Sequence, residues 1–190
     1  MKNWVDEKER ANLIKKSSGV TLEIGFGSGL NLPFYENTTK LYALDPSKEL
    51  WSLAKERINA VSFPVEFIEA SAEKIPLADN TVDTVVSTWT LCSIPKPELA
   101  LKEIKRILKP NGKFIFIEHG KSPEEKIFQW QKRLNPIWGR LAGGCQLDKK
   151  PDTLLSNTGF EIVELEKGLQ CPQIFSYMYK GSAIIKKGYE

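Results

Sequence analysis

The chain has 190 residues, 41% of them hydrophobic, and no low-complexity tract or internal repeat, so we expect one globular domain over residues 1–190. The 27 basic and 24 acidic residues leave a net charge of +3, which is too balanced to predict a nucleic-acid partner. No apolar run approaches the roughly 20 residues that span a bilayer, and the N-terminus lacks a signal-peptide core, so we expect a cytoplasmic protein. Three widely spaced cysteines without a Cys-x-x-Cys pair predict neither a disulfide framework nor a metal site: Cys92, Cys145 and Cys171.

The N-terminal segment, residues 1–18, is predicted to form a helix. Apolar residues recur among many charges between Trp4 and Lys16, which is the pattern of a helix with one buried face. We expect this helix to lie over the start of the domain.

The stretch Val20–Gly29, VTLEIGFGSG, combines a short apolar strand with three closely spaced glycines. Gly25, Gly27 and Gly29 are typical of a buried parallel strand that turns sharply toward a helix, where backbone can approach a ligand closely. A dinucleotide-binding loop needs a further glycine where Leu30 stands, which disfavours a nicotinamide cofactor. From this stretch alone, a plain strand-to-helix junction is an equally good interpretation.

The next predicted strand, residues 41–44, ends at Asp45. A carboxylate at this strand tip is well placed to accept hydrogen bonds from both hydroxyls of a ribose. Asp45 can also serve as the N-cap of the helix that begins near Pro46 and Ser47, and the two roles are compatible.

These motifs resemble those of a known family. The three glycines, with Glu23 two residues before the first, and Asp45 twenty residues after it resemble the cofactor motifs of the class I S-adenosylmethionine-dependent methyltransferases, and in particular their type 11 branch. The resemblance implies an α/β fold, a Rossmann-like seven-stranded and mostly parallel sheet whose last strand is antiparallel, with helices on both faces. It also implies that S-adenosylmethionine is the cofactor and that these residues bind it: Glu23, Gly25, Gly27, Gly29, Asp45, Pro46, Ser71, Ala72 and Thr88.

The elements after the glycine loop follow the order that this fold requires. Residues 30–35 are predicted to begin a first crossover helix, residues 47–58 to form a second, and residues 65–68 to form the third strand. Residues 69–77, EASAEKIPL, resemble the family's segment against the adenine ring. Ser71 stands where relatives commonly carry an acid, so it offers a weaker, neutral acceptor, while Ala72 is expected to contribute its backbone amide.

The fourth strand is predicted at residues 82–87, next to the glycine loop in the sheet. Ligands in open α/β sheets bind beyond the carboxyl ends of such strands, so residues 87–94, STWTLCSI, are expected to line the site. This sequence lacks the motifs of the amino-methylating and cytosine-methylating nucleic-acid enzymes. Trp89 and Cys92 are therefore expected on the side of a small substrate, although Cys92 is also well explained as a small apolar filler.

A helix over residues 97–108 and a Pro-Gly turn lead into the fifth strand, a pattern that again resembles the family: IKRILKPNGKFIFIEH. The strand ends at Glu118 and at His119, the only histidine in the chain. A lone histidine is usually a structural hydrogen-bonder, but its place at a ligand-facing strand end also makes His119 a possible general base. Glu118 is placed either to orient its ring or to meet a basic substrate.

Residues 120–150 are predicted to be an insertion that covers the substrate. Within it, FQWQKRLNPIWGRLAGGCQL, residues 128–147, resembles the corresponding stretch of the small thiol S-methyltransferases of the methyltransferase-like group. This implies a thiol acceptor, with Trp138 and Cys145 on the substrate side. The resemblance extends more loosely to bacterial phospholipid N-methyltransferases and quinone-biosynthesis methyltransferases, so a lipid or quinone-type acceptor stays open.

The same segment alternates tryptophan and aliphatic residues with Lys132, Arg133 and Arg140. Such a stretch can lie on a lipid surface, with tryptophan at the level of the headgroups and cations against anionic lipid. Its more frequent use is in a core or a substrate cover. Peripheral membrane contact is therefore retained as an alternative.

The chain closes with a predicted helix at residues 152–158 and two strands at residues 160–166 and 174–185. Methyl transfer from a sulfonium requires donor and acceptor to be held in line, so no protein nucleophile is needed, and no metal is indicated. Two other hypotheses remain, a nicotinamide enzyme and a non-catalytic relative that binds the cofactor. No pattern specifies the oligomeric state.

Overall fold

The computed structural model describes residues 7–170 and 173–188, with the side chains of residue 170 and residues 173–175 left aside, so Cys171 lies outside the described residues. The described residues form one seven-stranded sheet in the order β3-β2-β1-β4-β5-β7-β6, in which β7 runs antiparallel to both of its neighbours. This confirms the predicted Rossmann-like sheet. The strands are β1 Ser18–Ile24, β2 Asn37–Leu44, β3 Val65–Ile68, β4 Val82–Thr88, β5 Leu108–His119, β6 Phe160–Gln170 and β7 Gln173–Ile185.

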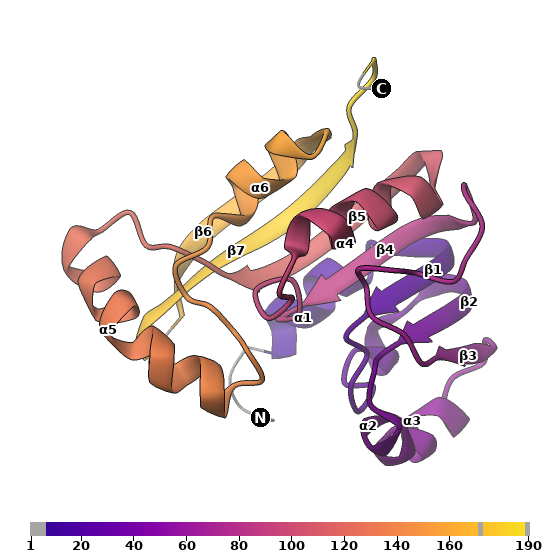
Figure 1. Cartoon of the computed structure of the whole chain (residues 1–190). Coiled ribbons are helices and arrows are strands. Elements are labelled where there is room, and N and C mark those ends of the chain that lie inside the picture. Colours follow the sequence, from indigo (N-terminus) through magenta and orange to yellow (C-terminus); the bar gives the residue numbers. More distant parts are fainter. Residues whose placement is uncertain (1–6, 171–172, 189–190) are drawn as a thin grey trace.

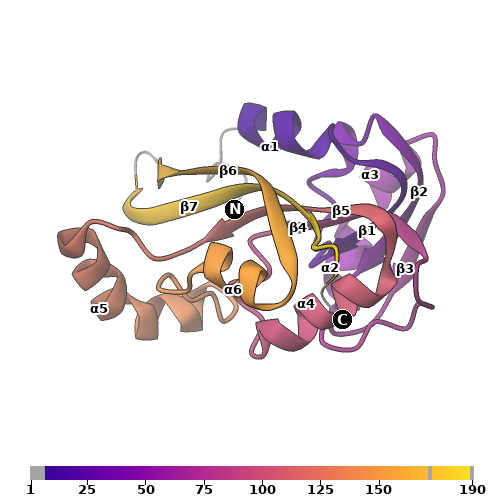
Figure 2. The same cartoon turned by 90° about the horizontal axis from the view of Figure 1, so that it is seen from above.

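Helices cover both faces of the sheet. Figure 2 shows α4 and α6 on one face and α1 and α3 on the other, while α5 lies beyond the end of the sheet in Figure 1. The helices are α1 Glu7–Ile14, the 3-10 turn η1 Leu32–Phe34, α2 Lys48–Leu53, α3 Lys55–Asn59, α4 Pro97–Ile107, α5 Glu125–Leu141 and α6 Pro151–Asn157.

Two apolar cores follow from this layering. The α4 and α6 face buries Leu101 and Leu155 against β-strand residues, and the α1 face buries Ile14 in a second cluster. Alternate residues of β5 serve the two cores, with Phe114 and Phe116 in the first and Ile115 and Ile117 in the second, because successive side chains of a strand point to opposite faces. The near-continuous apolar sequence of β5 therefore fits a strand that is buried on both faces.

The two predicted crossover helices differ from the structure. β2 begins at Asn37, four residues before the predicted start, which leaves only residues 25–36 for the first crossover. That length accommodates the turn η1 but not a helix of several turns. The second helix is interrupted at Ala54, whose amide bonds to the Trp51 carbonyl at 2.9 Å in a 3-10 pattern, so α2 and α3 are separate.

Candidate active site

The glycine loop after β1 has the backbone conformation that its sequence predicts. Gly25, Gly27 and Gly29 have φ angles of 65°, 56° and 72°, a left-handed region that other residues adopt only at a cost. A Cβ at Gly25 would collide with the Thr90 side chain, so the loop lies directly against the segment after β4. Beside Gly27 the space is open, since the nearest atom to a Cβ there is 3.9 Å away.

Asp45 joins this loop to the end of β2. One of its carboxylate oxygens accepts a hydrogen bond from the Gly27 amide and the other accepts from the Ser47 amide, both at 2.8 Å. The N-cap of α2 is Ser47, whose hydroxyl accepts from the Leu50 amide, so the N-cap interpretation of Asp45 is wrong. Each carboxylate oxygen can still accept a second hydrogen bond, which leaves the predicted role toward a ribose intact.

Glu23 is buried, and both of its carboxylate oxygens are occupied by protein donors. Asn31 donates at 2.8 Å and the Tyr35 hydroxyl donates at 2.7 Å. Burial raises the pKa of Glu23 to about 7, against the opposing effect of these hydrogen bonds and of Arg10. The direct observation is thus a carboxylate that holds the loop in place, and its contact with the cofactor stays a prediction.

The last residue of β4 and the residue after it connect this network to α1. Asn31 also donates to the Thr88 hydroxyl at 3.1 Å and accepts from Arg10 at 2.7 Å. The Arg10 guanidinium lies 4.7 Å from the centre of the Trp89 ring. Trp89 itself has a φ of 52°, a strained conformation for a bulky residue and one that occurs most often at functional sites.

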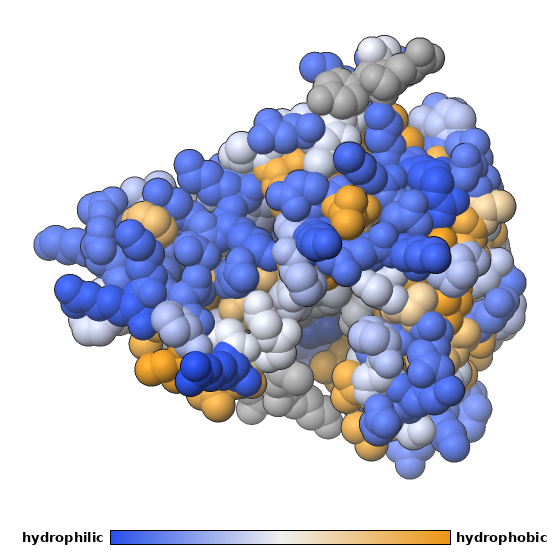
Figure 3. All heavy atoms as spheres, in the orientation of Figure 1, coloured by the Kyte–Doolittle hydropathy of each residue, from blue (hydrophilic) through white to orange (hydrophobic). Residues whose placement is uncertain are grey.

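The other predicted cofactor residues lie at the same sheet edge. Pro46 follows β2, Ser71 and Ala72 follow β3, and Thr88 ends β4; parallel strands bring these ends together. Ala72 is buried, whereas Ser71 is exposed and its hydroxyl accepts from the Glu73 amide at 3.2 Å. Figure 3 shows a hollow at this edge, between the part that carries α5 and the part that carries α2 and α3.

Beyond β4 and β5, three chemically active side chains meet. The Cys92 and Cys145 sulfurs lie 3.2 Å apart, and Nδ1 of His119 lies 3.9 Å from the first and 3.4 Å from the second. All three residues are buried. The wide spacing of the cysteines conceals this cluster in the sequence, and only the predicted positions of Cys92 and His119 at neighbouring strand ends pointed toward it.

Neighbouring residues hold the cluster from several directions. Glu118 accepts hydrogen bonds from the amides of Leu91 at 3.0 Å and Cys92 at 3.1 Å, so it fixes the loop after β4. The prediction that it orients the imidazole of His119 is therefore wrong. The Gln146 amide donates to the Cys92 carbonyl at 3.1 Å, which docks the Cys145 loop on the Cys92 loop.

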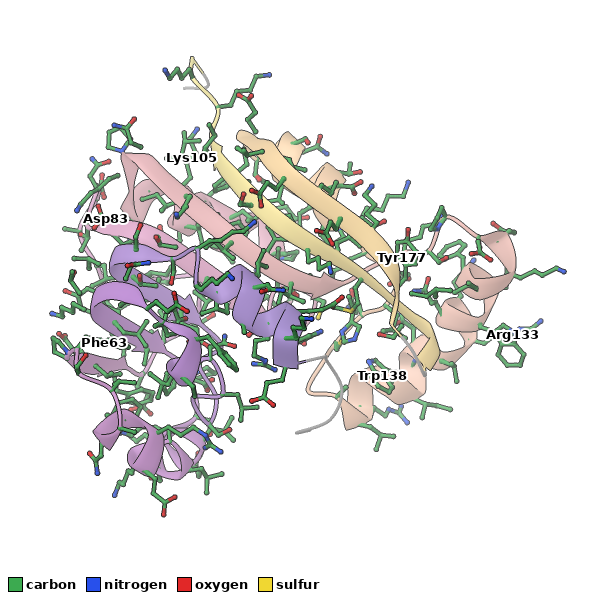
Figure 4. All side chains as sticks on the ribbon, turned by 180° about the vertical axis from the view of Figure 1, so that it is seen from behind. Phe63, Asp83, Lys105, Arg133, Trp138 and Tyr177 are labelled. Carbon is green, nitrogen blue, oxygen red and sulfur yellow. The ribbon has the colours of Figure 1, made fainter. Side chains whose placement is uncertain are left out.

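Trp138 of α5 also packs against the cluster. Its ring meets that of His119 edge-on, with 6.3 Å between centroids. In Figure 4 Trp138 lies on the side of α5 toward the sheet, and Arg133 points away. The predicted substrate-side residues Cys92, Trp138 and Cys145 are therefore neighbours.

The two thiols of the cluster differ in acidity. The Cys92 hydrogen bond and then those of His119 and Trp138 lower the pKa of Cys145 to about 5, although burial opposes this. The hydrogen bond to Cys145 and burial raise the pKa of Cys92 well above its usual range. A shift in this direction favours the thiolate form of Cys145, and a thiolate is both a nucleophile and a metal ligand.

A family model described as a methyltransferase domain matches residues 22–116, half of the chain. The chain belongs to the S-adenosylmethionine-dependent methyltransferases. S-adenosylmethionine is the cofactor of this family, as the sequence motifs predicted. A solved structure of similar fold is that of the 1,6-didemethyltoxoflavin-N1-methyltransferase of Burkholderia thailandensis, which has S-adenosylhomocysteine bound. That enzyme is 14% identical to this methyltransferase, with a TM-score of 0.72, and the match covers 98% of this chain and 80% of that one.

Two curated relatives differ in the acceptor that their names state. This methyltransferase is 31% identical over 173 residues to thiol S-methyltransferase TMT1B of Homo sapiens, covering 85% of this chain and 71% of that protein. It is 30% identical over 153 residues to the phosphatidylethanolamine N-methyltransferase of Cereibacter sphaeroides, and the match covers 80% of this chain and 74% of that protein. The chain spans about two thirds of the length of the thiol S-methyltransferases that it matches. Among the described residues, no helix is long and apolar enough to cross a membrane.

Proposed function

We propose that this methyltransferase transfers the methyl group of S-adenosylmethionine to the sulfur of a small thiol. The observation that carries the proposal is the similarity to a thiol S-methyltransferase over 85% of the chain. An alignment of that length includes the whole segment from β4 to α6, whichever end it leaves out. It therefore covers the acceptor side of the site.

The residues at the sheet edge fit the cofactor. The open space beside Gly27 gives backbone access to a ligand, and Asp45 retains acceptor capacity for two ribose hydroxyls. We assign cofactor binding to the predicted set, in which Gly25 and Gly29 shape the loop and Glu23 braces it. The glycine loop is bordered by the other members of the set, which are Pro46, Ser71, Ala72 and Thr88.

S-adenosylmethionine supplies a methyl group on a sulfonium, and its transfer to a thiolate sulfur is an in-line displacement. The protein has to align the acceptor and exclude water, and we assign this task to Trp89, Cys92, Trp138 and Cys145. Residues 120–150, which include α5, serve as the substrate cover. The predicted base His119 is not required for this step, because a thiol with a pKa near 8.5 needs little help to ionise.

The test is methyl transfer from labelled S-adenosylmethionine to a panel of acceptors, an alkyl thiol, a phosphatidylethanolamine dispersion and a quinol. Turnover on the thiol at a rate well above that on the other two supports the proposal. Cofactor binding without turnover on any member of the panel contradicts it and favours a non-catalytic role.

A second candidate function is N-methylation of a phospholipid headgroup. The relative named for phosphatidylethanolamine supports it, and so does the outer side of α5, where Trp130, Ile137 and Leu141 are 56%, 62% and 82% exposed. Apolar side chains are visible at the end of α5 in Figure 3. We propose a cytoplasmic protein, which in this second case makes peripheral contact with a membrane through α5.

A further inference from the structure

The Cys92, His119 and Cys145 donor atoms converge from three separate segments of the chain. Cys92 follows β4, His119 ends β5, and Cys145 lies in the loop after α5. Their ligand atoms all lie within 4.8 Å of one another, and the side chains are buried. A cluster of two thiols and an imidazole has the composition of a zinc site with three protein ligands.

The distances also agree with one shared ion. Tetrahedral zinc with Zn–S of about 2.3 Å and Zn–N of about 2.0 Å requires about 3.8 Å between two sulfurs and about 3.5 Å between a sulfur and the nitrogen. The corresponding separations here are 3.2 Å for the sulfurs, and 3.4 and 3.9 Å to His119 Nδ1. Shifts of about 0.6 Å or less in each edge would therefore accommodate the ion.

We propose that Cys92, His119 and Cys145 bind Zn²⁺, with the fourth coordination position open to the sulfur of the acceptor thiol. The metal site stands on the geometry alone, whereas its use in catalysis rests on the proposed function. Two thiolates balance the charge of the ion, so the bound site adds no net charge to the interior. The imidazole nitrogen is directed at both sulfurs, an arrangement that a metal uses and a Cys92–Cys145 disulfide does not.

The surroundings hold the three proposed ligands in place. Glu118 fixes the Cys92 loop and Gln146 docks the Cys145 loop on it, so the ligands are held before the ion arrives. A small pocket borders the cluster, and its further walls are mainly apolar: Leu91, Lys149, Pro151 and Leu154. Thr90 packs against Gly25 of the glycine loop and stands two residues before Cys92 in the sequence. The segment that carries Cys92 therefore starts beside this loop.

The chemistry balances without any further reactant. The thiol R–SH loses its proton to solvent when its sulfur takes the fourth position. That sulfur then forms the new S–CH₃ bond while the bond from the methyl carbon to the sulfonium breaks, and the electron pair stays on the cofactor sulfur. The thioether product has no negative charge, so it binds zinc weakly and leaves.

The first experiment uses Co²⁺ as a spectroscopic probe on the full reduced chain. We expect one equivalent of Co²⁺ to give an intense thiolate-to-cobalt charge-transfer band that Zn²⁺ abolishes. Cys92→Ser and Cys145→Ser should each weaken Co²⁺ binding roughly 100-fold or more. Cys171→Ser, which removes the third cysteine of the chain, should retain the band.

X-ray absorption on the Zn²⁺-loaded wild-type chain keeps the proposal testable if the variants fail to fold. Two sulfurs at about 2.3 Å and one nitrogen at about 2.0 Å support the site. A wild-type chain that binds Co²⁺ no better than the two serine variants overturns it, as does a Cys92–Cys145 disulfide that forms equally fast with Zn²⁺ present.

The role toward the acceptor has a spectroscopic readout in addition to turnover. An alkyl thiol added to the Co²⁺-loaded chain should strengthen the charge-transfer band as a third thiolate binds. A spectrum that the thiol leaves unchanged overturns the open-position role. Thiol methylation that persists at full rate after Zn²⁺ is removed with a chelator also overturns that role, yet leaves the proposed function standing.

Discussion

The Asp45 carboxylate at the end of β2 accepts a hydrogen bond of 2.8 Å from the Gly27 amide in the loop after β1. This hydrogen bond joins the end of β2 to the loop in the absence of any contact with the cofactor. A substitution at either residue therefore acts both on the loop and on the ligand that the loop is predicted to hold.

Asp45→Ala should weaken binding of S-adenosylhomocysteine by about 2 kcal/mol, or roughly 30-fold, because two charge-assisted hydrogen bonds to a ribose are lost. Calorimetric titration measures the change. Asp79→Ala is the control, since Asp79 is largely exposed and pairs with Arg106 away from this sheet edge. Equal affinities for the two variants would remove Asp45 from the cofactor site.

Gly27→Ala should abolish most cofactor binding at a modest cost in stability. A Cβ at this position meets no protein atom closer than 3.9 Å, so the loss of stability is limited to about 1–2 kcal/mol for a left-handed φ. The same methyl group would occupy the space predicted for the ligand. Gly188→Ala is matched to it, with a φ of 80° and open space, and should bind the cofactor normally. Equal binding by both variants would contradict the assignment of the loop.

Protein stability should fall as the pH rises from about 4.5 to about 7, because of Glu23. Burial raises its pKa to about 7 in the folded protein, against about 4.5 for an ordinary glutamate. Between these values the folded state keeps a proton that the unfolded state releases, which destabilises the fold by about 3 kcal/mol across the window. Below the window both states are protonated, and above it the full cost remains.

Urea unfolding at a series of pH values measures this slope in the wild type and in Glu23→Gln. The variant has no titrating group at this position, so its stability should change less over the same window. Glu161→Gln, on the exposed surface of β6, should keep the wild-type slope. A slope that survives in Glu23→Gln would assign the pH dependence to another group.

The outer side of α5 provides a test of membrane contact. If the second candidate function holds, Ile137→Ser together with Leu141→Ser should weaken binding to anionic phospholipid vesicles about 30-fold or more, because each change removes about 1–2 kcal/mol of apolar burial. Leu53→Ser on α2 is the matched control, since Leu53 is 65% exposed at a different end of the molecule. Vesicle sedimentation measures binding, and the absence of binding by the wild type would exclude this function.

Local patterns predicted most of the fold. The third strand begins and ends at the predicted residues, 65 and 68, and the fourth is longer than predicted only by Thr88. These strands are short apolar runs bounded by turn residues, so their ends are marked in the sequence itself. The first crossover was mispredicted because β2 begins at Asn37, in a polar stretch that pairs with β1 and has no strand periodicity of its own.

The sequence predicted a nucleoside-binding loop, because the glycine positions together with an acidic strand end are local features typical of such a turn, and the contact of this loop with the cofactor stays a prediction. The proximity of Cys92, His119 and Cys145 depends on the tertiary fold, since 26 and 53 residues separate Cys145 from the other two. Strand order and the return of the chain after α5 bring them together. Such long-range contacts depend on the packing of the whole sheet, which no local pattern encodes.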